Sequence, residues 1–170
     1  MKEINLTQGK VALVDDEDYD WLNQYKWCAL KYKHGYYAVR SMWINGKNTR
    51  IIMPRLILDI KDSKVLVDHK DRNGLNNQRY NIRKATKAQN RMNCNPKING
   101  SSIFLGVKKK RNIRKGLQKR KLPPKYWIAS IKTNNKTKTL GTFETEIEAA
   151  RAYNNAAKMY HGEFANLNNV

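Results

Sequence analysis

Residues 68–90, DHKDRNGLNNQRYNIRKATKAQN, constrain the fold of this chain more than any other stretch. The apolar run at residues 65–67 predicts a short buried strand that delivers Asp68 and His69 at its end. Residues 71–77, DRNGLNN, consist largely of types that tolerate turns, so they separate this strand from a second short one. The order therefore begins as strand, loop, strand.

A helix follows the second strand. Thr86 and Gln89 have the spacing of a capping box, in which each side chain bonds to the backbone of the other residue. The helix is expected to run to about Met92, with Asn90 one turn inside it. Asn90 is expected to face back toward the strand that carries the acid and the histidine.

This arrangement suits metal-dependent cleavage of a phosphodiester. Such a site holds its metal ion with few protein oxygens, and a nearby imidazole takes a proton from water. Asp68 and Asn90 supply oxygens and His69 supplies the imidazole. Magnesium or manganese fits an oxygen-rich site better than zinc does. The surrounding cations, which we expect to contact DNA, are Arg79, Arg83, Lys84 and Lys87.

The net charge indicates a polyanionic partner. The chain has 34 Lys and Arg against 14 Asp and Glu, a formal charge of +20, and nucleic acid is the leading candidate. No apolar run approaches the roughly 20 residues that cross a bilayer, and no signal peptide is recognisable, so a cytoplasmic protein of a bacterial or phage-infected cell is expected. Cys28 and Cys94 fit no zinc-finger spacing and are interpreted as reduced thiols.

Residues 1–49 predict a small β-rich unit. Asn45-Gly46 is a hairpin-turn signal, and Pro54 is expected to lie in the first turn of a short helix just beyond this unit. The aromatic side chains of this part form either its core or a base-stacking surface, and the sequence does not separate the two. These residues are Trp21, Trp27, Trp43, Tyr36 and Tyr37.

Residues 50–93 resemble the ββα-metal core of HNH endonucleases of the phage and mobile-intron type. The resemblance lies in the motifs Asp68-His69, Asn81-Ile82-Arg83 and Gln89-Asn90. It implies that His69 is the general base, that Asp68 and Asn90 ligate a divalent metal, and that Asn81 ties the loop and helps to hold the histidine. Pro54-Arg55-Leu56 stands where that family often has His-Arg-Leu.

Residues 94–100 predict a linker, and the pattern changes after it. Residues 101–140 contain no Asp or Glu and many Lys and Arg, a density that suits a phosphate backbone. Three strands are expected, the last two joined by a turn at Asn134-Asn135. A second capping box, Thr145 with Glu148, predicts a long helix whose alanine face packs on the sheet.

Residues 101–170 resemble the Apetala/ethylene-response-factor type of DNA-binding domain, through the strings LGTF, EAARAY and GEFANLN. In that family the sheet enters the major groove, which the resemblance implies here as well. The insertion at residues 112–125 is interpreted as either a flexible basic loop or an extra clamp on DNA. The residues expected on the DNA-binding surface are Lys108, Lys110, Trp127, Ser130, Lys132, Thr137 and Thr139.

The sequence therefore predicts an α+β protein: a β-rich unit at 1–49, a ββα-metal core at 50–93, a linker at 94–100, and a C-terminal three-stranded antiparallel sheet packed on one helix at 101–170. The expected activity is that of a homing-type endonuclease, which nicks double-stranded DNA or cuts both strands as a monomer or homodimer, with no further protein partner. The alternative is a non-catalytic, sequence-specific DNA-binding regulator with a degenerate nuclease core. An RNA-binding protein would explain the charge but not the ordered motif.

Overall fold

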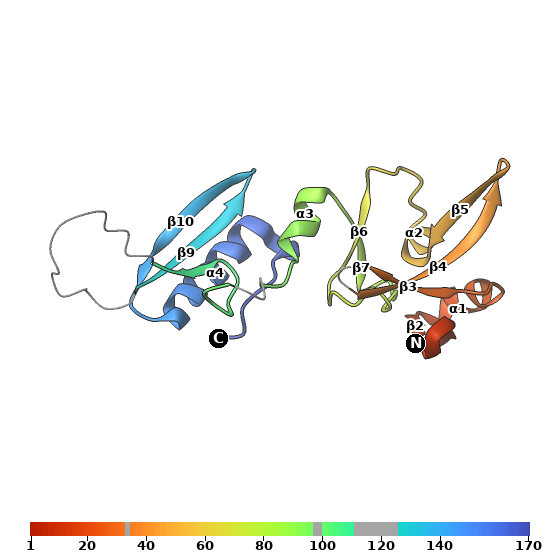
Figure 1. The fold of residues 1–170 in the computed structure, drawn as a ribbon, viewed down its shortest axis with the longest axis horizontal. Coiled ribbons are helices and arrows are strands. Elements are labelled where there is room, and N and C mark those ends of the chain that lie inside the picture. Colours follow the sequence, from red (N-terminus) through yellow and green to blue (C-terminus); the bar gives the residue numbers. More distant parts are fainter. Residues whose placement is uncertain (33–34, 97–99, 111–125) are drawn as a thin grey trace, which may run out of the picture. The chain divides into compact units, whose positions relative to one another are not determined.

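The computed structural model describes residues 1–32, 35–96, 100–110 and 126–170, and these form two compact units (Figure 1). Unit 1 comprises residues 1–91 and unit 2 comprises residues 92–170. The predicted boundary between residues 49 and 50 falls inside unit 1. The β-rich segment and the strands of the predicted nuclease core therefore belong to one compact body.

Unit 1 opens with a small antiparallel pair of strands, β1 (Lys2–Asn5) and β2 (Val11–Val14), joined through the short 3-10 helix η1 (Thr7–Gly9). Helix α1 (Asp16–Asn23) follows and has three acidic residues in its first turn. Their negative charges interact favourably with the positive end of the helix dipole. The helix starts within the acidic run DDED, residues 15–18.

A second antiparallel sheet has the order β3 (Cys28–Tyr32), β4 (Gly35–Ile44), β5 (Lys47–Ile52). The turn between β4 and β5 confirms the hairpin signal: Asn45 and Gly46 have φ values of 50° and 73°, as a type I′ turn requires.

Helix α2 (Met53–Ile57) begins directly after β5, with Pro54 buried in its first turn as expected. Arg55 ties the segment after α2 to the helix, because its guanidinium donates to the carbonyls of Ile60, Asp62 and Val65. These three hydrogen bonds fix the chain immediately before the strand that carries Asp68.

The core of unit 1 uses only some of the aromatic residues. Trp27 is buried and its indole N–H donates to the carbonyl of Leu22 at 2.9 Å. Trp21 and Tyr36 pack against the same core as partly buried side chains. Trp43 behaves differently, because 73% of its surface is exposed near the end of β4.

The expected strand, loop, strand, helix order is present. Strands β6 (Leu66–His69) and β7 (Ile82–Ala85) form an antiparallel pair, and α3 (Lys87–Met92) follows. The capping box is confirmed: the Thr86 amide donates to Gln89 Oε1, and the Gln89 amide donates to Thr86 Oγ1. Helix α3 buries none of its residues, so its packing as the helix of a ββα-metal core stays a prediction.

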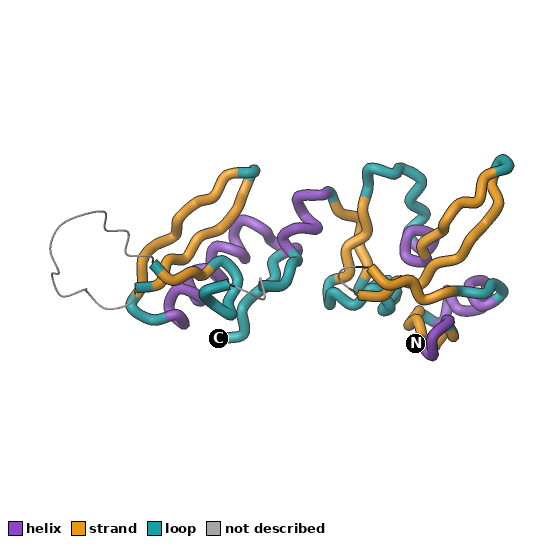
Figure 2. The backbone as a smooth tube through the Cα atoms, viewed as in Figure 1, coloured by secondary structure: helices purple, strands orange, loops and turns teal. Residues whose placement is uncertain are grey.

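Unit 2 is the expected three-stranded antiparallel sheet on one helix (Figure 2). The strand order is β10 (Lys136–Phe143), β9 (Trp127–Thr133), β8 (Val107–Lys109). Helix α4 (Glu146–His161) packs on this sheet and ends in the 3-10 helix η2 (Gly162–Phe164). The predicted capping box of Thr145 and Glu148 and the turn at Asn134-Asn135 are both confirmed.

Small side chains set the helix-to-sheet contact in unit 2. The buried alanines of α4 face the sheet, and their size lets the helix backbone approach it closely. They are Ala149, Ala150, Ala156 and Ala157. The residues of the predicted insertion, 112–125, lie outside the described residues. Within the described part of the chain, no helix is long and apolar enough to cross a membrane.

Candidate active site

The candidate site lies on the β6–β7 pair. Asp68 pairs with Arg83 and His69 with Ile82 across the two strands. Asp68 and His69 are adjacent in sequence, yet both side chains are buried, with 4% and 6% of their residue surfaces exposed. Burial of an acid and an imidazole is costly unless each has polar partners, so the partners indicate how the site is built.

Arg83 is the partner of Asp68. Its Nε and Nη2 atoms lie 2.8 and 2.7 Å from Oδ2 of the carboxylate. Because both side chains belong to paired residues of neighbouring strands, the sheet register itself brings them together. Arg83, which the sequence assigns to DNA contact, thus lies in the site as the counter-ion of Asp68.

His69 is held from two sides. Its Nε2 lies 3.2 Å from Oδ1 of Asn77, and its ring meets the ring of Tyr37 edge-on, with centroids 5.9 Å apart. Burial lowers the pKa of His69, while the bond to Asn77 and the carboxylates of Asp71 and Asp68 act in the opposite direction. The net lowering favours a neutral imidazole at neutral pH.

The fully buried amide of Asn77 determines the tautomer of His69. The Asn77 Nδ2 group donates to the carbonyl of Leu75 at 3.3 Å and contacts the sulfur of Met53 at 3.5 Å. Oδ1 is therefore the atom directed at His69, and it accepts a hydrogen bond from Nε2–H. We therefore assign the ring proton to Nε2, which leaves the lone pair of the imidazole on Nδ1.

Asn81 organises the loop between the two strands. Its Nδ2 donates to Asp71 Oδ1 and to the carbonyl of Asn76, and its Oδ1 accepts from the Asp71 amide at 3.0 Å. Asn76 Nδ2 in turn donates to Asp71 Oδ2 at 2.8 Å. The amide whose side chain bonds to His69 is thus Asn77, which the sequence did not single out, and Asn81 shapes the loop that positions it.

Arg79 joins the same loop to helix α1. Its guanidinium donates to both carboxylate oxygens of Asp18 at 2.8 and 2.7 Å and also pairs with Glu17. The Arg79 amide donates to Asp15 at 2.7 Å. The Asp18 hydrogen bond raises the pKa of Arg79. The side chain expected to meet DNA is therefore occupied in the contact between the loop and α1.

The remaining residues of the predicted site are exposed. Lys84 on β7 and Lys87 and Asn90 on α3 all face solvent. Among the described residues, no three His, Cys, Asp or Glu side chains are grouped as a metal site. Asp68 and Asn90 offer oxygen donors, the ligands that magnesium and manganese prefer, so their chemistry fits these ions.

In unit 2, strand alternation distributes the predicted DNA-binding residues over the two faces of the sheet. Pairing of Thr137 with Lys132 and of Thr139 with Ser130 places these four side chains on the sheet face opposite α4. Trp127 is the exception, since it packs against the core cluster beneath the sheet. It therefore lies on the helix side.

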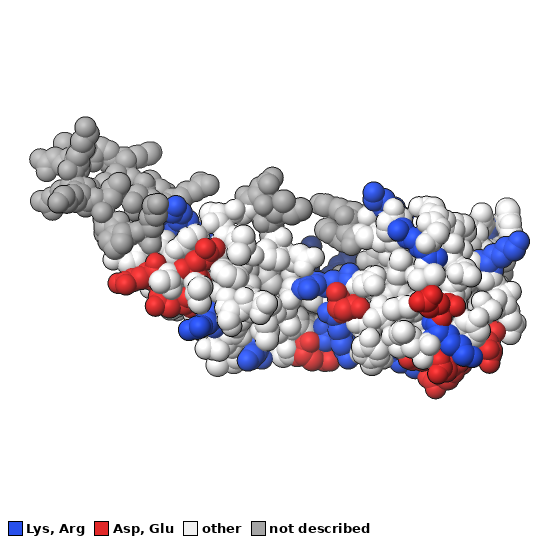
Figure 3. Space-filling model, turned by 90° about the horizontal axis from the view of Figure 1, so that it is seen from below, with Lys and Arg blue, Asp and Glu red and all other residues white. Residues whose placement is uncertain are grey.

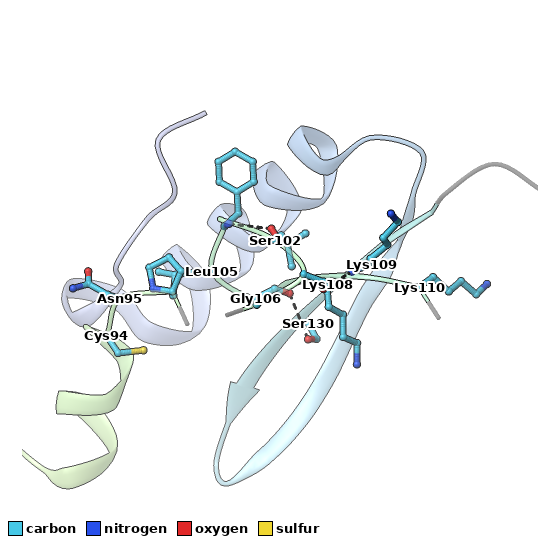
Figure 4. Close-up of a pocket in the computed structure, with 14 residues that line it drawn as sticks. Cys94, Asn95, Ser102, Leu105, Gly106, Lys108, Lys109, Lys110 and Ser130 are labelled. Carbon is cyan, nitrogen blue, oxygen red and sulfur yellow. Dashed lines mark hydrogen bonds between the residues drawn. The ribbon is translucent and has the colours of Figure 1, made fainter. Parts of the chain in front are cut away.

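Strand β8 extends this outer face. Lys108 pairs with Ile128, a neighbour of Ser130 on the same face. Figure 4 shows Lys108 and Ser130 pointing to the same side of the sheet, beside an open pocket that Lys110 also lines, and Lys109 pointing to the other side. Glu146 and Glu148 lie instead in the first turn of α4, and Figure 3 shows acidic side chains gathered at one end of unit 2. The outer face is thus basic and hydroxyl-rich.

One relative spans both units. An uncharacterized HNH endonuclease from Acanthamoeba polyphaga mimivirus is 31% identical to the chain over 166 residues, which make up 96% of this chain and 77% of that protein. The chain matches no protein-family model. No solved structure matches it significantly.

The Arg79 contact yields a stability prediction. Arg79→Ala leaves the carboxylate of Asp18 buried without its cation, and we expect the free energy of unfolding to fall by about 2 kcal/mol, below the range for fully buried pairs because Arg79 is half-exposed. Lys84→Ala, which removes an exposed cation from the same region, is the control and should change it by less than about 0.5 kcal/mol. Urea denaturation of both variants checks this; equal effects would contradict the structural role of Arg79.

Proposed function

The chain belongs to the HNH endonuclease family, and we propose that it is a site-specific, homing-type DNA endonuclease with a histidine base and one divalent metal ion. The observation that carries this proposal is the buried Asp68-His69 pair, in which Asn77 orients the imidazole. A family relative that spans both units supports it.

The proposed base is Nδ1 of His69. Because Asn77 engages Nε2–H, we assign the role of base to Nδ1, and the lowered pKa keeps the ring neutral and ready to accept a proton. The water that loses this proton attacks phosphorus in line with the leaving 3′-oxygen. The ring of Tyr37, packed against the imidazole, limits its rotation.

The metal ion would be held by Asp68 and Asn90. Magnesium or manganese, when bound, polarises the phosphate and stabilises negative charge on the leaving oxygen. Arg83 fixes the orientation of the Asp68 carboxylate through Oδ2. A single catalytic core cuts one strand in each binding event, so cleavage of both strands would need a second copy or a second encounter.

Unit 2 is proposed to recognise the duplex in the manner of an Apetala/ethylene-response-factor type domain. Its outer sheet face presents lysines and hydroxyl groups, and a β-ribbon or sheet fits the width of the major groove. The lysines would contact phosphates, whereas Ser130, Thr137 and Thr139 would face base edges. This division gives unit 1 the chemistry and unit 2 the choice of sequence.

Pro54 supports a second candidate, a DNA-binding regulator without nuclease activity. It is buried in α2, at the position where the resembled family often has a histidine. A regulator would keep the outer face of unit 2 and would have no use for the orientation of His69.

Loss of His69 tests the enzymatic proposal. In a plasmid-nicking assay with magnesium, we expect His69→Ala to cut at least about 100-fold more slowly than the parent, because it lacks the general base. Its affinity for DNA should match that of the parent. His69→Gln, which keeps most of the buried volume, guards against an effect of misfolding. Absence of cleavage by the parent on DNA that it binds would favour the regulator.

The outer face of unit 2 yields a salt-dependence prediction. Lys132 lies on that face, whereas Lys138 lies on the helix side, 2.7 Å from the Tyr160 hydroxyl. Removing one phosphate contact should reduce the slope of log affinity against log salt by about 1. We expect this for Lys132→Ala and not for Lys138→Ala, measured by fluorescence anisotropy between low and physiological salt. A parent slope near zero would contradict DNA binding through this face.

A further inference from the structure

The ribbon formed by β4 and β5 extends well beyond the core of unit 1 (Figure 1). Every residue from 41 to 50 is exposed, on both strands and in the turn. The core contacts of β4 end before this segment, with the buried residues Ala38 and Val39. A two-stranded ribbon without a packed face is marginally stable in water, so its length requires a reason other than folding.

The exposed end of the ribbon carries a large aromatic side chain. Trp43 is 73% exposed and is paired with Asn48, one residue pair away from the turn. Strand alternation places Ser41 and Arg50, which pair with each other, on the same face as Trp43. That face therefore combines an indole with a guanidinium and two small polar side chains.

The opposite face of the ribbon provides a contrast. Met42 and Ile44 lie there, each 41% exposed, together with Lys47, the cross-strand partner of Ile44. Arg40 also lies on that face, but it is engaged, because its guanidinium stacks 3.8 Å from the ring centre of Tyr25 and donates to the sulfur of Met42. Arg40 thus secures the base of the ribbon.

The charge around the ribbon has one sign. The sequence contains no Asp or Glu from residue 21 to residue 58. Within the described part of the chain, neither Lys47 nor Arg50 belongs to an ion pair. In the view of Figure 3, acidic side chains of unit 1 gather near the N-terminus and α1. An uncompensated basic tip with an exposed indole is complementary to nucleic acid, which offers phosphates and base faces together.

We propose that the exposed end of the β4–β5 ribbon is a DNA-contacting arm of unit 1, separate from both the nuclease site and the sheet of unit 2. Trp43 stacks on a base of an opened base step, and Arg50, on the same face of the ribbon, neutralises a flanking phosphate. Insertion of an apolar side chain unstacks a step and bends the duplex, and the larger protein–DNA interface that the bend permits offsets the cost of unstacking. The proposed role of this arm depends on DNA being the substrate, but it does not depend on DNA cleavage.

The test compares variants of the full chain on a duplex that the parent selects from a random-sequence pool, with EDTA present so that only binding is measured. Loss of one base–aromatic stack should weaken affinity by about 5- to 150-fold in Trp43→Ala. Trp43→Phe, which keeps a smaller aromatic face, should lose less than Trp43→Ala. Met42→Ala, on the opposite face of the same ribbon, is the control and should bind as the parent does.

A second readout reports base opening directly. A 2-aminopurine placed at successive positions of the selected duplex should become brighter at one step with the parent and with His69→Ala, but not with Trp43→Ala. Three results would each contradict the proposal that the ribbon contacts DNA. The first is an unchanged affinity of Trp43→Ala, and the second is an equal loss of affinity in Trp43→Ala and Met42→Ala. The third is self-association of the parent that Trp43→Ala abolishes without any effect on DNA affinity. Binding without cleavage would contradict the nuclease and leave the arm standing.

Discussion

The hydrogen bond between Asn77 and His69 is the interaction on which the candidate active site depends. A buried imidazole can present either nitrogen, and only a fixed partner makes one of them reliably the base. Asn77 provides that partner because its own N–H group is committed to Leu75 and Met53. The Asn81 and Asp71 network shapes the loop, and Arg79 ties that loop to α1. Much of unit 1 thus supports the imidazole that we propose as the base.

Local signals made much of the fold predictable. The capping boxes at Thr86 and Thr145, the turn at Asn45-Gly46 and the strand that ends in His69 all depend on neighbours within a few residues. A short-range pattern contains all the information that such features need. The same holds for the three strands and the alanine-faced helix of unit 2, whose alternation and spacing are visible in the sequence.

Long-range partners were not predictable. Arg79 bonds to Asp18, 61 residues earlier, and a count of basic residues cannot distinguish this partly buried contact from a DNA contact. Asn77 lies in an Asn-rich loop, where the motif directed attention to Asn81 and no sequence signal marked the other amide. Trp27 and Trp43 both stand in strand-favouring runs of the sequence, yet Trp43 is 73% exposed and Trp27 is 3% exposed. Tertiary packing determines which part of each strand is covered, and this decides which tryptophan is buried.

The most direct measurement is the single-turnover cleavage rate of Asn77 variants on saturating duplex with magnesium. Asn77→Ala removes the acceptor that fixes the tautomer, and we predict a rate about 10- to 100-fold below that of the parent, with affinity unchanged. Asn77→Asp keeps an acceptor for Nε2–H and should retain most of the rate, which separates orientation from loss of folding. A parental rate in Asn77→Ala would contradict the account, because His69 would then act without the bond proposed to orient it.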